Sequence, residues 1–264
     1  MSIGNRACIV DCYSGDGAVE PLVLRANGAD ALCVKAGQGN WQDARFKETW
    51  ARAKGILPRQ AYWFLDPRYS LTDHIKAILA ALGNDPGEMP LLQDYEANSK
   101  LGIALAPLSW LYQIDGAILK AIGRPTMIYT NQNYWTMGNG LTYPWAATRD
   151  LFTAQYPFVP NPSTGQPKVY APWRREGVAD AKVWRAWQFT DHGTMPGMES
   201  KSRDISVFNG TVAEMNAWIA TFGAPPEPPD TPLFMDLPEP LRWGMVEAHL
   251  RRAGEVSLEG HPIG

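Results

Sequence analysis

The stretch Pro90-Leu-Leu-Gln-Asp-Tyr-Glu-Ala-Asn98 ends an apolar run in two carboxylates, Asp94 and Glu96. Side chains alternate between the faces of a strand, so both acids point to the same side, roughly 6 to 7 Å apart. At an effective dielectric constant near 20, repulsion between the two charged forms is about 2 to 3 kcal/mol, which raises one pKa by roughly 2 units. One acid can then remain protonated near neutral pH while the other is ionised. Glycosidases use such a pair as a general acid and a supporting anion, although a strand ending in two solvated acids gives the same pattern.

Length and composition indicate one enzyme-sized domain followed by a tail. A chain of 264 residues can bury roughly 70 to 75% of its unfolded surface without a metal or disulfide. The net charge of -3 and the absence of a Lys/Arg-rich run argue against a nucleic-acid partner. Eleven Trp and ten Tyr residues supply flat apolar faces that suit either sugar rings or a protein core.

The N-terminal sequence Met1 to Arg6 lacks the apolar stretch of a signal peptide, and no window approaches 18 apolar residues. The sequence therefore predicts synthesis in a cytoplasm without a signal peptide and without membrane insertion.

Cysteine and histidine usage gives no indication of a metal or another cofactor. Cys8, Cys12 and Cys33 are expected to be buried reduced thiols, and the four histidines are scattered. There is no H-E-x-x-H motif, no C-x-x-C pair and no serine in a G-x-S-x-G turn. We therefore expect neither metal-assisted hydrolysis nor serine catalysis.

Short apolar runs alternate with helical periodicity, which is typical of a parallel α/β barrel. Eight strands are predicted near residues 7–11, 31–35, 60–65, 91–96, 126–130, 151–156, 183–189 and 205–208. Helices are predicted over residues 42–53, 71–82, 108–122 and 212–222. Polar residues gather at the ends of the early strands, where such barrels build their active sites: Asp11, Lys35, Asp66, Asp94 and Glu96.

The second half departs from a regular barrel. Residues 157–167 are rich in proline, and residues 190–203 lack helical periodicity. A short link without a helix favours antiparallel pairing of the last two strands. The first residue of the last strand, Asp204, would then lie at the same end of the barrel as Asp11, Asp94 and Glu96. The expected fold is an irregular TIM-like (β/α)5β3 barrel over residues 1–223.

The chain resembles the lysozymes of glycoside hydrolase family 25, the Chalaropsis-type muramidases found in bacteria, fungi and phage endolysins. The resemblance runs from about Ile9 to Phe222. It rests on the order and spacing of Val10-Asp11, Val34-Lys-Ala-Gly-Gln-Gly39, Ala61-Tyr-Trp-Phe64, Asp94-Tyr-Glu96, Met127-Ile-Tyr-Thr130, Trp187-Gln-Phe189 and Asp204-Ile-Ser-Val-Phe-Asn209. It implies hydrolysis of the β-1,4 bond between N-acetylmuramic acid and N-acetylglucosamine in bacterial peptidoglycan, without a cofactor.

The resemblance also implies roles for individual residues. Glu96 would be the general acid/base and Asp94 its assistant, acting either as nucleophile or by orienting the substrate's own 2-acetamido group. We favour the second role, because both acids lie on one strand and do not face each other across a cleft. The expected substrate-binding residues are Asp11, Asp204, Tyr62, Phe64, Tyr129, Gln38, Asp66, Trp135 and Gln188.

One position departs from the family pattern. Where the family usually carries Lys-Ala-Thr-Glu-Gly, this chain reads Lys35-Ala-Gly-Gln-Gly39, so a neutral Gln38 replaces an acid. Glutamine can hydrogen-bond a sugar hydroxyl but adds no charge that would shift the pKa of a neighbour. A lower activity or a shifted pH optimum is expected.

Two other functions fit parts of the pattern. A chitinase-like hydrolase would extend the acidic series two residues upstream, where this chain has Leu92. A catalytically weak or inactive barrel that binds the cell wall or forms part of a virion would retain the same sequence pattern, so sequence separates it poorly from an active enzyme.

The C-terminal segment differs in composition. Residues 224–240 contain seven prolines, which predicts an extended linker, and residues 241–253 can form one amphipathic helix. This segment either folds back on the barrel or docks on a cell wall or a phage particle. A phage lysin of this kind would be made in the host cytoplasm and reach the wall after holin release or on a virion.

Overall fold

The computed structural model describes residues 4–156, 165–179 and 183–223. Nothing in these ranges forms a helix with the length and apolar character needed to cross a membrane. The predicted linker and helix of residues 224–264 lie outside the described residues.

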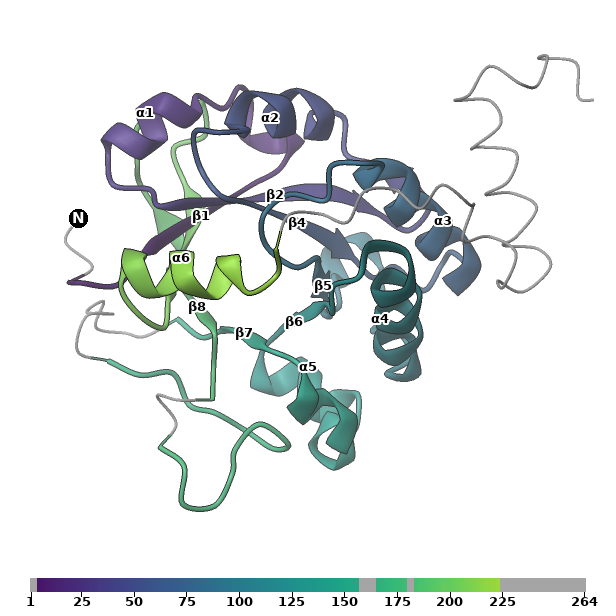
Figure 1. Cartoon of the computed structure of the whole chain (residues 1–264). Coiled ribbons are helices and arrows are strands. Elements are labelled where there is room, and N and C mark those ends of the chain that lie inside the picture. Colours follow the sequence, from purple (N-terminus) through teal and green to yellow (C-terminus); the bar gives the residue numbers. More distant parts are fainter. Residues whose placement is uncertain (1–3, 157–164, 180–182, 224–264) are drawn as a thin grey trace, which may run out of the picture.

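A closed barrel of mixed strand direction is the centre of the fold (Figure 1). Within the described residues its eight strands are β1 (Cys8–Cys12), β2 (Ala31–Gln38), β4 (Arg59–Phe64), β5 (Leu92–Asp94), β6 (Met127–Thr130), β7 (Leu151–Ala154), β8 (Ala186–Gly193) and β9 (Arg203–Phe208). Pairing is parallel from β1 through β2 and β4 to β8. The last strand, β9, is antiparallel to both β8 and β1 and closes the barrel. The predicted reversal of the last strand is confirmed.

Helices follow each of the first five barrel strands, as the predicted (β/α)5β3 arrangement requires. They are α1 (Pro21–Ala26), α2 (Phe46–Ala53), α3 (Leu71–Leu82), α4 (Ser109–Ile122) and α5 (Gln132–Met137). A sixth helix, α6 (Val212–Ala220), follows β9. Figure 1 shows α1 to α4 around the outer face of the first strands, whereas irregular chain takes the place of helices beside β7 and β8. The described part of the β7–β8 connection and the β8–β9 connection contain no α-helix.

Two local differences from the predicted elements have clear causes. The helix expected from residue 42 begins only at Phe46, because Trp41–Gln42 forms a short strand, β3, paired with the end of β2. Gly39 makes the turn between these strands with φ +59°, a conformation that side-chain-bearing residues rarely adopt. Helices α1 and α5 were not predicted, since six residues each are too few for a clear apolar period.

The barrel interior is apolar at the amino ends of the strands and polar at their carboxyl ends. One buried cluster holds Ile9, Cys33, Leu92, Met127, Phe152 and Phe208 together with Met215 and Trp218 of α6. The Phe208 and Trp218 rings lie 5.5 Å apart between centroids. Helix α6 therefore closes the interior at the amino ends of the strands, and the carboxyl ends remain for a binding site.

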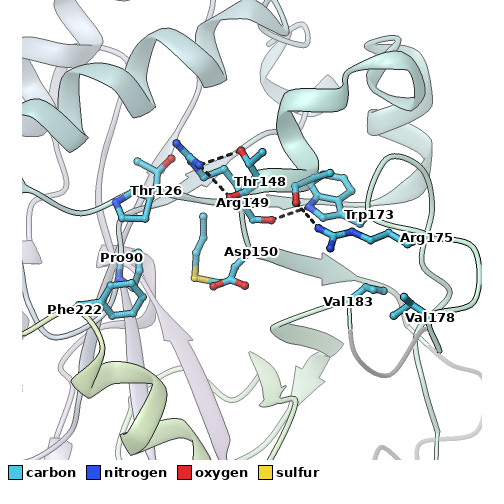
Figure 2. Close-up of a pocket in the computed structure, with 13 residues that line it drawn as sticks. Pro90, Thr126, Thr148, Arg149, Asp150, Trp173, Arg175, Val178, Val183 and Phe222 are labelled. Carbon is cyan, nitrogen blue, oxygen red and sulfur yellow. Dashed lines mark hydrogen bonds between the residues drawn. The ribbon is translucent and has the colours of Figure 1, made fainter.

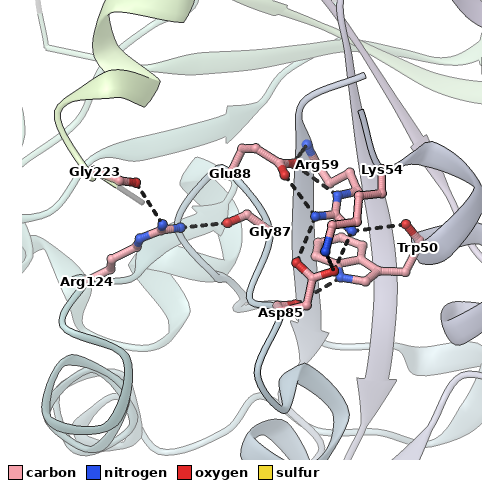
Figure 3. A network of polar contacts seen from close by, with 8 residues as sticks. All are labelled: Trp50, Lys54, Arg59, Asp85, Gly87, Glu88, Arg124 and Gly223. Atoms are coloured by element: carbon pink, nitrogen blue, oxygen red, sulfur yellow. Dashed lines mark hydrogen bonds and ion pairs between the residues drawn. The ribbon is translucent and has the colours of Figure 1, made fainter. Parts of the chain in front are cut away.

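A network of ion pairs and backbone contacts fixes the amino end of β4 (Figure 3). The guanidinium of Arg59, 1% exposed, binds both carboxylate oxygens of Asp85 at 2.8 and 3.0 Å and those of Glu88 at 2.8 and 3.0 Å. Nearby, Arg124 donates to the carbonyls of Gly87 at 2.7 Å and Gly223 at 3.1 Å. The Arg124 contact thus ties Gly223, which lies just after α6, to the barrel.

Candidate active site

A hollow of about 390 Å³ opens at the carboxyl ends of the strands. Nine of the expected site residues line it: Asp11, Gln38, Tyr62, Phe64, Asp94, Glu96, Tyr129, Gln188 and Asp204. Eight of them lie on β1, β2, β4, β5, β6, β8 and β9, and Glu96 follows β5, so closure of the barrel brings them together. The predicted convergence of four carboxylates on one mouth is present in the structure.

Asp94 and Glu96 reach this hollow from the end of one strand. Asp94 is the last residue of β5 and is paired with Phe64 on one side and Tyr129 on the other. The strand ends two residues earlier than predicted, yet the backbone N–H of Tyr95 still bonds the carbonyl of Tyr129 at 2.9 Å. The Tyr95 side chain is buried on the other face, against the ring of Trp135. Side-chain alternation therefore continues past the strand end and returns Glu96 to the hollow.

Both acids resist ionisation. Burial and, next, the negative charge of Asp204 raise the pKa of Glu96 to about 7, while Lys35 opposes this shift. Burial and, next, the charge of Glu96 raise the pKa of Asp94 well above its usual range. The Oδ1 atom of Asp94 is buried and has no hydrogen-bond partner among the described groups. The pair can thus hold a transferable proton near neutral pH and retains an oxygen free to accept a bond.

Gln188 links Asp11 to two tyrosine hydroxyls on the other side of the mouth. Its Nε2 donates to Oδ2 of Asp11 at 2.9 Å, and its Oε1 accepts from the hydroxyls of Tyr129 at 2.8 Å and Tyr156 at 2.7 Å. The two tyrosine donors define which end of the amide faces Asp11. Burial and, next, the charge of Asp204 raise the pKa of Asp11 to about 8 despite the bond from Gln188.

Asp204 itself is less perturbed. Burial, followed by the charges of Asp191 and Asp16, raises its pKa to about 6. Of the four carboxyl groups in the mouth, Asp204 is therefore the most fully ionised at neutral pH, and its negative charge acts on Glu96.

Gln38 lies between a cation and a buried anion. Its Oε1 accepts from Nζ of Lys35 at 3.2 Å, and its Nε2 donates to Oδ2 of Asp66 at 2.9 Å. Burial alone would raise the pKa of Asp66, but bonds from Arg68 and Gln38 bring it down to about 2. A glutamine side chain, with one acceptor and one donor end, satisfies both neighbours.

Two expected substrate-binding residues do not line the mouth. Asp66 is 0% exposed and is bound by Gln38 and Arg68, so it supports Gln38 and has no open path to a ligand. Trp135 is also 0% exposed, its indole N–H donates to the carbonyl of Ala171 at 2.9 Å, and its ring packs on Tyr95 and Trp173. We therefore correct both assignments: these are supporting core residues without a surface for sugar contact.

The structure adds lining residues to which the sequence analysis assigned no catalytic or substrate-binding role: Tyr13, Cys33, Lys35, Leu92, Asn98 and Leu101. Lys35 is at the end of the predicted strand, but β2 continues to Gln38 and Lys35 lies within it. Asn98 lies shortly after the end of β5. Leu101 belongs to a short 3-10 helix (Ser99–Leu101), and nothing in the sequence pattern indicates its location. Among the residues that the structure describes, no three His, Cys, Asp or Glu side chains form a group able to hold a metal ion.

A second hollow of about 460 Å³ adjoins the first. Glu96 and Tyr129 line both, and the remaining walls of the second come from the chain after β6, the end of β7 and residues 168–170. Glu96 therefore lies at the junction of two adjoining cavities. An extended ligand with its reacting bond at Glu96 would occupy both.

A third hollow, of about 250 Å³, lies at the opposite end of the barrel (Figure 2). It is lined by residues that precede β5, β6 and β7, such as Pro90, Pro125 and Asp150. Its charged groups have partners: Arg149 binds Asp115, and Asp150 accepts from Arg185 at 3.0 Å. This cavity offers no group with the proton-transfer character of Glu96.

Comparison with known proteins agrees with this architecture. The chain is 26% identical over 195 residues to the uncharacterized Escherichia coli protein YegX, a match covering 70% of this chain and 61% of YegX. The chain thus spans less than two thirds of the length of that relative.

Solved structures share the fold. The bacterial lysozyme from Streptomyces coelicolor superposes with a TM-score of 0.67 at 20% identity, covering 83% of this chain and 99% of that one. A family 25 glycosyl hydrolase from Bacillus anthracis gives 0.63 at 19% identity, with 81% and 93% covered. The catalytic domain of an endolysin from a bacteriophage of Listeria monocytogenes gives 0.59 at 14% identity, with 81% and 97% covered.

The family assignment comes from the sequence itself. Residues 10–198, well over half of the chain, match the profile of the family described as Glycosyl hydrolases family 25. This match includes Asp11, Asp94 and Glu96 and ends just before Asp204. The chain belongs to glycosyl hydrolase family 25.

Proposed function

We propose that this protein is a lysozyme that cleaves the β-1,4 bond between N-acetylmuramic acid and N-acetylglucosamine in bacterial peptidoglycan. The observation that carries the proposal is the location of Asp94 and Glu96 at the end of one strand, in a polar groove, with both pKa values raised by burial. Membership of family 25 and the shared fold of a bacterial lysozyme support it.

In this mechanism Glu96 is the general acid. Its pKa near 7 keeps a large protonated fraction at neutral and mildly acidic pH, so it can donate to the leaving glycosidic oxygen. Once ionised, the same carboxylate accepts a proton from the water that completes hydrolysis.

Asp94 assists the substrate's own 2-acetamido group. The acetamido oxygen attacks the anomeric carbon as the glycosidic bond breaks, and water then opens the cyclic intermediate with net retention of configuration. Oδ1 of Asp94, buried and unpaired among the described groups, can accept the acetamido N–H. Because Asp94 and Glu96 leave the same strand, they reach the sugar from one side, which supports substrate assistance over direct attack by Asp94.

Other groove residues would hold the sugar. Tyr62, Phe64 and Tyr129 supply aromatic walls of the kind on which sugar rings pack, and Asp11 and Asp204 supply acceptors for hydroxyl groups. Gln38 and Gln188 line the groove but already bond protein groups, so they position their neighbours as well as offering contacts.

A catalytically weak or inactive wall-binding barrel is the second candidate, and the replacement of the family's usual acid by Gln38 is the observation that favours it. The retained carboxylates and their raised pKa values favour an active enzyme. Synthesis in a host cytoplasm, release by a holin and attachment to a virion or wall through residues 224–264 remain parts of the proposal for a phage-type lysin.

Digestion of purified peptidoglycan tests the function. Cleavage by a muramidase leaves N-acetylmuramic acid at the new reducing end, so borohydride reduction and mass spectrometry should show muramitol. Reduced glucosamine ends would assign a glucosaminidase, and free peptides an amidase. No loss of turbidity at any pH from 4 to 8, with the protein folded, would support the inactive barrel.

A further inference from the structure

The second hollow beside Glu96 has a different chemical character from the first. Its lining includes one residue with an ammonium group, Lys168, and four residues with side-chain amides: Asn131, Gln132, Asn133 and Gln155. The first hollow also has amide-bearing residues, but it differs in having four carboxyl groups beside Lys35. The two cavities on either side of Glu96 therefore suit different parts of one ligand.

Charge decides where an anionic group of the ligand can lie. In the first hollow Lys35 is already bound to Gln38, and its charge acts on Asp94 and Glu96. A ligand carboxylate placed there would also face Asp204, whose pKa of about 6 leaves it largely ionised at neutral pH, so the two negative charges would repel each other. Asp204 does not line the second hollow, where Glu96 is the only acid among the described lining residues.

Lys168 is available and its backbone is fixed. Its N–H donates to Oε1 of Gln155 at 2.7 Å, which ties it to the residue after β7. The residue is exposed, and within the ranges that the structure describes no ion pair joins its side chain to a carboxylate. An exposed ammonium at the wall of an amide-lined hollow can bind a carboxylate without losing another partner.

We propose that the second hollow binds a carboxylate-bearing part of the glycan substrate, and that Lys168 is its charge-recognition residue. This inference rests on the proposed lysozyme function and specifies its substrate: a glycan with carboxylates beyond the cleaved bond, in preference to a neutral one. The carboxylate belongs to a peptide attached to muramic acid or, where the sugar carries no peptide, to its free lactyl group.

Binding to a catalytically blocked protein separates recognition from turnover. In the Glu96→Gln background, we compare Lys168→Gln with Lys47→Gln, a matched control at an exposed position of α2. Calorimetry is carried out with three soluble oligomers: a peptide-bearing muropeptide oligomer, the same oligomer after amidation of its carboxyl groups, and a peptide-free glycan strand that retains its lactyl carboxylates.

We expect Lys168→Gln to weaken binding of the peptide-bearing oligomer by about 5- to 20-fold, as loss of a charge-assisted hydrogen bond would, and to leave the amidated oligomer unchanged. The lactyl carboxyl is amide-bonded to the peptide in the first oligomer and is free only in the peptide-free strand. A loss on the first oligomer alone would identify a carboxylate of the peptide, and a loss on the peptide-free strand as well would show that Lys168 also binds a free lactyl carboxylate. Lys47→Gln should change none of the three affinities.

Equal affinities of the two lysine variants for every oligomer would overturn the inference, as would an equal loss on charged and amidated oligomers. If the wild-type protein still hydrolyses peptidoglycan, such a result removes only the role of Lys168. If no oligomer is bound and the wild-type protein hydrolyses no peptidoglycan, both the proposed lysozyme function and the role of Lys168 are wrong.

Discussion

Nε2 of Gln38 donates a hydrogen bond to Oδ2 of the buried Asp66 at 2.9 Å, and on its other side Gln38 accepts from Lys35. A glutamate at position 38 could satisfy Lys35 but would direct a second carboxylate at Asp66. The glutamine that departs from the family pattern is thus matched to its neighbours in this chain.

Gln38→Glu should therefore lower the free energy of unfolding by about 1 to 3 kcal/mol, through loss of the donor to Asp66 and repulsion between acids. The positive charge of Lys35 lowers the pKa values of Glu96 and Asp94. The new carboxylate would offset that charge, so both pKa values should rise. We expect the alkaline limb of the pH–activity profile to move upward. Gln38→Met is the control: it should lose stability without the pH shift. A Gln38→Glu variant as stable as the wild type would show that the Asp66 contact is unimportant.

Glu96→Gln tests the general acid. The substitution is nearly isosteric and removes only the transferable proton, so wall hydrolysis should fall by about 10²- to 10⁴-fold with the fold and saccharide binding retained. Turbidity loss, circular dichroism and calorimetric binding check the three parts. Turnover near the wild-type level in a folded variant would exclude Glu96 from this role.

Two charge-removing variants should shift the pH profile in opposite directions. Activity requires protonated Glu96, so it should decline as pH rises through about 7. Asp204→Asn removes a negative charge that raises the pKa of Glu96, and the decline should move to lower pH. Lys35→Met removes a positive charge that lowers this pKa, and the decline should move to higher pH.

Shifts of roughly 0.5 to 1 pH unit are expected for each. Measurement of kcat/KM against pH reports the free enzyme. Shifts in the same direction for both variants would indicate that the decline of activity at high pH is controlled by a group other than Glu96.

Part of this site could be predicted from the sequence because strand alternation and strand ends are local properties. Asp94, Glu96 and Asp11 follow from them, and the reversed direction of β9 follows from the short β8–β9 link. Whether a side chain beyond a strand end turns inward depends on packing that no local pattern shows. Trp135 is therefore buried against Tyr95 and Trp173 instead of facing a ligand, and Lys168 reaches the groove from an irregular segment.

Asp94→Asn should abolish most activity while stabilising the protein at alkaline pH. The pKa of the Asp94 carboxyl is raised in the folded state. As pH rises from about 4, the unfolded chain therefore releases the carboxyl proton before the folded protein does. The free energy of unfolding of the wild type falls between the unfolded and the folded pKa values. The asparagine side chain of the variant does not titrate. Scanning calorimetry should show a higher Tm than wild type at pH 8 and a smaller difference at pH 4; a lower Tm at pH 8 would contradict the assigned burial penalty.

The same residue separates two mechanisms. With substrate assistance, mass spectrometry of the intact protein should detect no glycosyl adduct, and a thiazoline mimic of the cyclic intermediate should inhibit the wild type. A covalent sugar on Asp94 would instead make it the nucleophile.

Ending the chain after Gly223 should leave the barrel folded and active on soluble oligomers. Met215 and Trp218 of α6 pack against the barrel interior, and Arg124 holds the carbonyl of Gly223, so these contacts are retained in the shortened protein. We expect hydrolysis of soluble muropeptide oligomers within a few fold of the full chain, with any loss appearing on intact walls, where a tethered second contact acts through effective concentration. Ending the chain after Asn209 is the control and should prevent folding, because it removes α6. If the protein ending at Gly223 is insoluble or melts many degrees lower, residues after 223 are part of the folded domain and the separate docking role loses its support.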